Sequence, residues 1–393
     1  MLALALSCLG LAAAPAPQLP LDHPGPYAAA SRDVAFTDAR FGRGRGTGRL
    51  DFPADDPDPS AGPDPLVGFQ HGWLGAPDDY DELSLRLASW CFLVASIGTE
   101  TGSFADPVAE AADTQALLWW TADRSATPGD PLEDMADPRR AWSAVGHSMG
   151  GGALAPLVGL EPRVGAVVGL QAAALDSHRS DVRAFSGAAL WIAGSDDWVV
   201  RPAVVRDWFE AAASASRRDL YVRVRGMGHL GPTDDPGNGD PLPGAVQQRI
   251  HRRLVTAFLR AEALGEVEDW SAFLGPERDP YRIHLESACL EPPAWLWTEA
   301  GLIHLAAAGR PQGRLAFGAS FVPAPRDTPC GELGFAPGAA FALPPLRLGL
   351  EGMAASAVPL PPSWRGRPLL FATLGAGDGS PPRFGPTGAV VLR

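Results

Sequence analysis

Ser148 is the residue of this sequence best placed for nucleophilic chemistry. It stands at the centre of the segment Gly146-His-Ser-Met-Gly150, which has the pattern Gly-x-Ser-x-Gly. An apolar strand-like segment, 142–145, precedes it and a segment that can be helical, 153–160, follows it, so the serine is expected at a sharp turn between a strand and a helix. Such a turn strains the backbone and needs small neighbours, and Gly146 and Gly150 provide the room. The pattern in this setting predicts an activated serine rather than an ordinary glycine-rich turn.

A serine hydroxyl needs a base that takes its proton, and His229 is the candidate base. It follows an apolar run and is flanked by glycines, as is typical of a histidine in a loop above a serine. Asp197, in the turn after another apolar run, is the candidate acid, and the order serine, acid, histidine fits successive strand ends of one sheet. We expect His229 to act as general base and then general acid, with Asp197 fixing its tautomer. Asp196, in the same turn, is the alternative acid.

Two backbone N–H groups are candidates for stabilising an oxyanion. The N–H of Met149 lies at the start of the helix that follows the serine. The N–H of Trp73 lies in the loop after the early apolar strand 66–70. The Trp73 indole would then lie along the acyl site and stack on a flat group of the substrate. Leu175 and Trp198 are further candidate substrate contacts.

The composition excludes several kinds of chemistry. The chain of 393 residues has 32 basic side chains, and every one is an arginine. The absence of lysine excludes a P-loop lysine, a Schiff-base lysine and the strand lysine of a protein kinase. The net charge of −13, without an arginine cluster, argues against a nucleic-acid partner. No group of His, Cys, Asp and Glu has the spacing of metal ligands, so we expect neither a metal nor a cofactor.

The candidate residues would be positioned by an α/β domain over residues 32–264. Short apolar strands alternate there with segments of helical spacing, which is typical of a doubly wound, mostly parallel sheet covered by helices on both faces. The expected strands are 33–37, 48–52, 66–70, 91–96, 142–145, 164–170, 189–193 and 220–224, and helices are expected at 79–89 and 106–120.

The rest of the chain divides by composition. Residues 1–16 begin with an apolar run that is too short to span a bilayer and ends in small residues, which predicts an export signal although no positive charge precedes it. Residues 17–31 are rich in proline and alanine and predict a linker or arm. Residues 265–300 are polar and marked by proline, which indicates a connection. Residues 301–393 alternate with period two between Gly and Pro turns, which predicts a small all-β module, a sandwich in outline.

These pieces together resemble the α/β-hydrolase superfamily and, within it, the dienelactone hydrolase and polyester hydrolase (cutinase-like) branch. The resemblance covers about residues 25–264 and is sharpest in the segment Gly-His-Ser-Met-Gly-Gly-Gly at 146–152. It implies hydrolysis of a carboxylic ester through an acyl-enzyme. Polyester hydrolases carry a tryptophan after the strand that follows the serine, and Leu175 stands at that place here. This departure favours a small or lipid-like ester over an aromatic polymer.

We therefore expect an exported serine esterase, in the periplasm or outside the cell, that acts on a small-molecule or lipid-like ester and has no membrane span. An acyltransferase with the same triad is an alternative, with an alcohol in place of water. A non-catalytic protein whose β module binds the ligand is another. The sequence leaves the oligomeric state open. It also leaves open whether Cys289 and Cys330 form a disulfide, as is plausible in an exported protein.

Overall fold

The structure is a computed structural model of the chain. It describes residues 21–38, 40, 42–54, 63–275, 283–289, 291–300, 302–309, 312, 314–321, 326–328, 331–333, 341–351, 353–377, 380–384 and 388–392. The expected export signal at 1–16 lies outside these residues. No helix among the described residues is long and apolar enough to cross a membrane.

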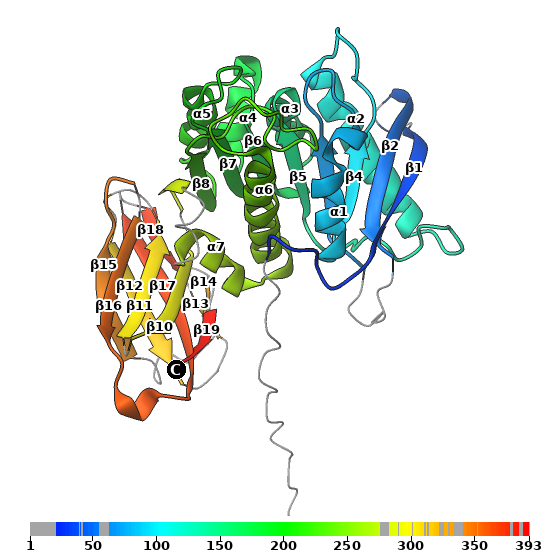
Figure 1. The fold of residues 1–393 in the computed structure, drawn as a ribbon. Helices are drawn as coiled ribbons and strands as arrows, with labels where there is room; N and C mark the ends of the chain where they lie inside the picture. Colours follow the sequence, from blue (N-terminus) through cyan, green and yellow to red (C-terminus); the bar gives the residue numbers. More distant parts are fainter. Residues whose placement is uncertain are drawn as a thin grey trace, which may run out of the picture.

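A nine-stranded sheet forms the centre of the larger part of the molecule (Figure 1). Its strands, in spatial order, are β1 (Ala29–Asp38), β2 (Arg43–Pro53), β4 (Leu93–Ile97), β3 (Leu66–Gln70), β5 (Trp142–His147), β6 (Val164–Leu170), β7 (Ala188–Gly194), β8 (Arg218–Val224) and β9 (Ile283–Ser287). The six strands from β4 to β8 run parallel, whereas β1, β2 and β9 pair antiparallel at the two ends of the sheet. All strand-end loops that follow the parallel strands therefore meet at one edge.

Helices cover both faces of this sheet because its parallel strands are apolar on both sides. One face packs against α1 (Asp81–Ser89) and α6 (Gly244–Leu259). The other face packs against α2 (Pro107–Ser125), α3 (Met149–Leu160), α4 (Arg179–Ala184) and α5 (Pro202–Ala212). Neighbouring strand residues point to opposite sides, so that Val168 belongs to the first core and Val167 to the second. The expected α/β class is confirmed.

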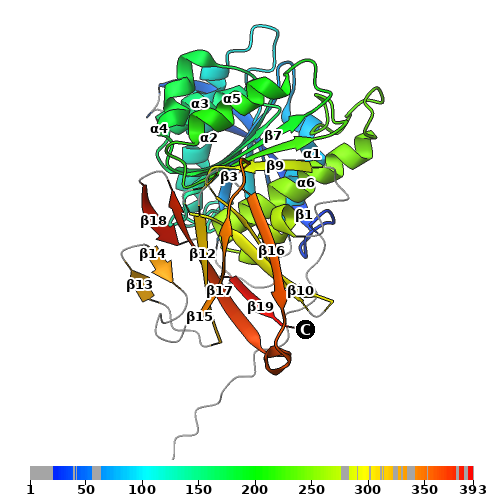
Figure 2. The same cartoon turned by 90° about the vertical axis from the view of Figure 1, so that its left-hand side faces the viewer.

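The C-terminal part consists of antiparallel sheets (Figure 2). Three strands form one sheet, β10 (Ala294–Glu299), β11 (Leu302–Ala308) and β16 (Met353–Pro359). A second sheet contains β15 (Phe341–Arg347), β12 (Arg314–Ser320), β17 (Pro368–Gly377), β18 (Ser380–Phe384) and β19 (Gly388–Val391), and β13 (Arg326–Thr328) pairs with β14 (Gly331–Leu333). The two larger sheets share an apolar core that includes Leu305 of β11 and Phe371 of β17. The additional β-rich part that the sequence predicts is present.

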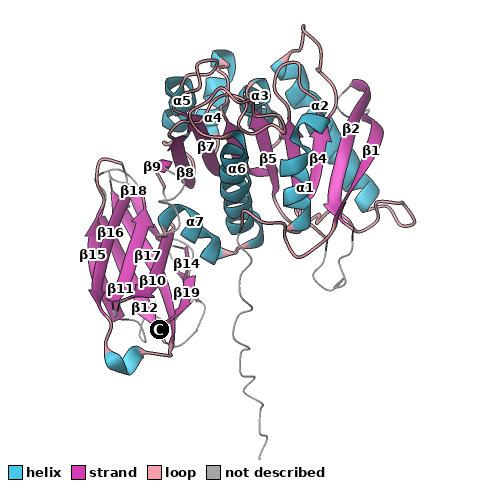
Figure 3. Cartoon of the chain, in the orientation of Figure 1, coloured by secondary structure: helices cyan, strands magenta, loops and turns pink. Residues whose placement is uncertain are grey.

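The segment 265–300 differs from the plain connection that the sequence predicts. It contains the helical turns η6 (Val267–Trp270) and α7 (Ser271–Leu274), and Figure 3 shows α7 between the two parts. It also supplies β9 to the large sheet and β10 to the β module. The reason is that each strand is short and lies between prolines and acidic residues, which hide its alternation. At the other end of the chain, β1 begins at Ala29, inside the expected arm.

Candidate active site

Ser148 lies at the sharp turn between β5 and α3. Its backbone angles are φ 52° and ψ −115°, in a region that a serine rarely adopts. A Cβ on Gly146 would lie 2.3 Å from the carbonyl oxygen of Gly150. A Cβ on Gly150 would lie 2.4 Å from the carbonyl oxygen of Gln70. The glycines therefore let the turn pass close to β3, which holds the Ser148 side chain at the carboxyl edge of the sheet.

The side chains of Ser148, His229 and Asp197 lie in a row. His229 Nε2 is 2.9 Å from Ser148 Oγ, and His229 Nδ1 is 2.8 Å from Asp197 Oδ2. The other carboxylate oxygen of Asp197 accepts hydrogen bonds from the backbone N–H groups of Val199 (2.9 Å) and Val200 (2.8 Å). Asp197 is buried, so its charge is held by three donors in a fixed orientation. This arrangement can move a proton from the serine to the histidine.

Asp196, the alternative acid, points elsewhere. Its Oδ2 accepts a hydrogen bond of 2.5 Å from Ser195 Oγ, and the residue is exposed. The structure brings Asp197, and not Asp196, into hydrogen-bonding contact with His229. Two adjacent aspartates in one turn thus have different surroundings, which the sequence alone does not distinguish.

The oxyanion loop, residues 71–75, passes directly beside the serine. A Cβ on Gly72 would lie 3.4 Å from Ser148 Cβ. The carbonyl oxygen of Gly72 accepts a hydrogen bond from Gly75 N–H (2.8 Å). Because the C=O and N–H of a trans peptide point in opposite directions, this bond fixes the direction of the Trp73 N–H. The loop is joined to the elbow by Gly150 N–H, which donates to His71 O at 3.0 Å.

Met149, the second candidate donor, is the first residue of α3. The first N–H groups of a helix have no partner one turn earlier and are directed outward from the helix start, where the dipole favours a negative charge. Met149 directly follows Ser148, so this N–H lies beside the nucleophile. The helix start can therefore stabilise an anion formed there.

A pair of buried side chains that the sequence analysis did not identify joins these loops from behind. The hydroxyl of Tyr80 is 2.9 Å from Gly72 N and 2.8 Å from His147 Nδ1. His147 Nε2 is 2.9 Å from the carbonyl oxygen of His229. Burial, together with the charge of His229, holds the pKa of His147 well below 6.5, and burial raises the pKa of Tyr80, so both are neutral at neutral pH. The local signals for them are weak: His147 lies inside the Gly-x-Ser-x-Gly segment, and Tyr80 has helical spacing with Leu83 and Leu87.

Exposed apolar side chains gather in the loops around the triad. Trp73 is 57% exposed, Phe104 98% and Trp198 83%. The Trp73 indole N–H donates to Ser103 O at 3.3 Å, which places the loop of Phe104 beside the oxyanion loop. The other exposed apolar residues of these loops are Leu74, Val199 and Leu230. Leu175 is half-buried and packs against the core beside α3, so the structure does not add it to this exposed group.

The described residues contain no group of three or more His, Cys, Asp and Glu side chains that could hold a metal ion. Cys289 is a buried free thiol whose Sγ is 3.7 Å from Asp219 O, and Cys330, with which the sequence left a disulfide open, lies outside the described residues.

Comparison with known proteins gives one clear finding. A family model for PETase, described as PET hydrolase-like, matches residues 14–235. The match covers more than half of the chain and includes Ser148, Asp197 and His229. No curated protein matches the sequence.

Proposed function

The chain belongs to the PET hydrolase-like family, a polyester-hydrolase branch of the α/β-hydrolases, and from this premise we propose that Ser148, His229 and Asp197 cleave carboxylic esters through an acyl-enzyme. Membership makes the protein an ester hydrolase with a serine-type mechanism. The assignment of roles to particular residues is our proposal, and the observation that carries it is the pair of contacts of His229. One ring nitrogen lies 2.9 Å from the serine and the other 2.8 Å from the carboxylate.

In the first half of the reaction Ser148 Oγ attacks the ester carbonyl carbon. The hydroxyl proton passes to His229 Nε2, and the carbonyl oxygen becomes an oxyanion. The N–H groups of Trp73 and Met149 stabilise this charge. When the tetrahedral intermediate collapses, the C–O bond to the alcohol breaks, and the alcohol leaves with the proton that His229 returns.

In the second half water takes the place of the alcohol. His229 accepts a proton from the water as its oxygen attacks the acyl-enzyme, and the same two N–H groups stabilise the second oxyanion. The acid then leaves and the proton returns to Ser148. Throughout, Asp197 keeps the proton of the neutral ring on Nδ1, so that Nε2 is ready to accept.

The surroundings of the site favour an apolar ester. Trp73, Trp198 and Phe104 expose rings in the loops beside the oxyanion loop and Asp197, and each can cover an acyl chain or a flat group without a charged partner. We propose Trp73 and Trp198 as substrate contacts. We also propose Leu175, which lies beside α3, as a substrate contact. The family and the apolar N-terminal run support an exported enzyme.

Labelling with a fluorophosphonate, followed by mass spectrometry of the labelled peptide, tests this proposal. We expect the label on Ser148, and we expect Ser148→Ala to lose turnover of p-nitrophenyl butyrate by about a millionfold. Ser214→Ala is the matched control, because Ser214 is exposed in the turn after α5. Label on another serine, or full activity of Ser148→Ala, would contradict the proposal.

A further inference from the structure

The Tyr80 hydroxyl lies at the centre of a chain of hydrogen bonds whose direction can be derived. The carbonyl oxygen of His229 can only accept, so His147 Nε2 must carry a proton and donate to it. A neutral imidazole has one proton, so Nδ1 of His147 is an acceptor. The Tyr80 O–H therefore donates to Nδ1, and its oxygen accepts from the N–H of Gly72. With His147 neutral, each hydrogen bond in the chain has one direction.

This chain links the three loops that carry the proposed machinery. Gly72 is in the oxyanion loop, His147 directly precedes Ser148, and the carbonyl that accepts at the far end belongs to His229. The packing is equally close, because a Cβ on Gly72 would lie 3.2 Å from the Tyr80 hydroxyl and 3.1 Å from His147 Nδ1. The His147 and His229 rings lie 4.9 Å apart. A small shift of the Tyr80 oxygen would therefore displace both the proposed oxyanion loop and His229, the proposed base.

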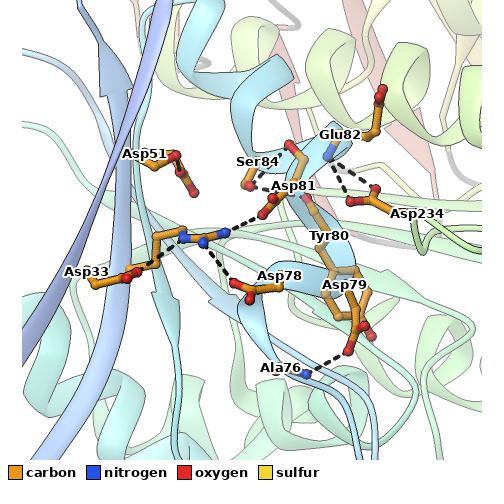
Figure 4. A network of polar contacts seen from close by, with 12 residues as sticks. Asp33, Asp51, Ala76, Asp78, Asp79, Tyr80, Asp81, Glu82, Ser84 and Asp234 are labelled. Atoms are coloured by element: carbon orange, nitrogen blue, oxygen red, sulfur yellow. Dashed lines mark hydrogen bonds and ion pairs between the residues drawn. The ribbon is translucent and has the colours of Figure 1, made fainter.

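Tyr80 itself is held firmly. It is 2% exposed, and its ring packs 4.9 Å from the ring of Phe69 on β3. It ends the turn η3 (Pro77–Tyr80), just before α1, and Figure 4 shows the polar contacts around this junction. Arg49 of β2 forms ion pairs with Asp78 on one side of Tyr80, at 2.7 Å, and with Asp81 on the other. The backbone on both sides of the tyrosine is thus tied to the sheet.

A second contact joins the same junction to the loop that follows His229. The carboxylate oxygens of Asp234 accept from Glu82 N–H at 3.2 and 3.3 Å (Figure 4). In addition, Asp234 N–H donates to Asp79 O at 2.8 Å. Asp234 therefore caps the start of α1 from a distant part of the chain. These contacts join the turn that carries Tyr80 to the loop that follows the proposed base.

We propose that Tyr80, acting through His147, is a positioning residue that keeps the oxyanion loop and His229 in register around Ser148. The inference rests on the proposed hydrolase function, because it assigns the role by its effect on that reaction. Tyr80 does not touch the substrate. Its oxygen alone forms hydrogen bonds with Gly72 N–H and His147 Nδ1, which would otherwise have to bond to water.

The test compares Tyr80→Phe with a matched variant, Tyr221→Phe. Each change removes one buried or half-buried hydroxyl, but the hydroxyl of Tyr221 donates to Pro202 O at 3.3 Å and makes no contact with the triad. For p-nitrophenyl butyrate we expect kcat of Tyr80→Phe to fall about ten- to a hundredfold, with KM changed by less than about twofold, because geometry is lost and binding is not. Tyr221→Phe should keep kcat. Equal kcat in Tyr80→Phe and the parent, or an equal loss in Tyr221→Phe, would overturn the inference.

A second pair of variants tests the same inference if Tyr80→Phe folds poorly. In His147→Gln the side-chain oxygen can accept from Tyr80 and the amide N–H can donate to His229 O, whereas His147→Met has similar length and neither group. We expect His147→Gln to retain at least about ten times the kcat of His147→Met. Equal loss in both would show that the hydrogen bonds do not matter.

Nitrogen-15 NMR of the histidine rings provides a readout that needs no turnover. We expect His147 to be protonated on Nε2 alone, and we expect its Nδ1 resonance to shift in Tyr80→Phe and stay unchanged in Tyr221→Phe. Protonation on Nδ1 would overturn the inference. If the parent protein shows the expected tautomer but hydrolyses no ester, the proposed function fails. An active enzyme with full kcat in Tyr80→Phe rejects the positioning role alone.

Discussion

Replacing Asp197 by asparagine is the change whose effect follows most directly from the site. Asp197 Oδ1 accepts two backbone N–H groups, from Val199 and Val200, and Oδ2 faces His229 Nδ1. In Asp197→Asn the two backbone N–H groups keep their hydrogen bonds to the amide oxygen, so the amide NH2 group must face His229. An NH2 group only donates, and Nδ1 then has to accept. The ring proton moves to Nε2, where it faces Ser148 Oγ and prevents the ring from taking the serine's proton.

The expected loss is about ten-thousandfold in kcat, the size that the wrong histidine tautomer causes in a serine triad. The assay is steady-state hydrolysis of p-nitrophenyl butyrate at neutral pH, with the Tm of each variant measured in parallel. Asp196→Asn is the control, because its carboxylate contacts Ser195 and is exposed. We expect it to change kcat by less than about threefold, as surface substitutions do.

Two results would refute this reasoning. If Asp197→Asn kept a tenth of the parent kcat, the two backbone donors would not control the orientation of the amide. If Asp196→Asn lost more activity than Asp197→Asn, the acid would be Asp196 and the geometry described here would not be the active one. Nitrogen-15 NMR of His229 distinguishes the causes, because only the tautomer argument places the ring proton on Nε2 in Asp197→Asn.

Three other changes test the structure around the site. Burial lowers the pKa of His251 from 6.5 to about 4, so the unfolded chain binds more protons between pH 4 and 6.5 and stability falls as the pH falls through that window. Between pH 7 and pH 4 the free energy of unfolding, measured with urea, should therefore fall by about 3 kcal/mol less in His251→Gln than in the parent. An equal fall in both proteins would contradict this. In Gly150→Ala the new Cβ would lie 2.4 Å from a backbone oxygen of β3. The change should therefore lower the free energy of unfolding by about 1–3 kcal/mol and abolish fluorophosphonate labelling of Ser148. Unchanged labelling would contradict the tight turn. Removal of residues 291–393 should lower the Tm by about 5 °C or more, and an unchanged Tm would show that the β module does not support the sheet.

The parallel strands and the serine turn could be predicted because their signals are local. A buried strand such as β6 is a continuous apolar run, and the turn at Ser148 needs glycines within two residues on either side. The order of the three candidate residues along the chain then limits how they can meet at one edge of the sheet. The structure places them within hydrogen-bonding distance of one another, and their chemical roles stay a proposal.

The links between loops could not be predicted, because they join residues far apart in the sequence. Nothing near Tyr80 indicates that its hydroxyl contacts His147, and Asp234, which caps α1, lies about 150 residues further along the chain. The strands β9 and β10 escaped detection for a similar reason. The strand β9 forms by pairing with β8, and β10 forms by pairing with β11, whereas neither has a strong sequence pattern of its own.

The way in which the β module joins the large sheet bears on the position of His229. The strand β8 leads into the His229 loop at one end, and without β9 it would be an edge strand with unpaired backbone groups. At its other end Arg218 forms ion pairs with the buried Glu262 and, at 3.1 Å, with Glu291 at the entrance to the module. Two alanines of β11, Ala306 and Ala308, belong to the same core as α6 and β8. The strand that leads into the loop of the proposed base is thus paired on its open side by β9, and its far end is joined by Arg218 and Glu291 to the chain that enters the module.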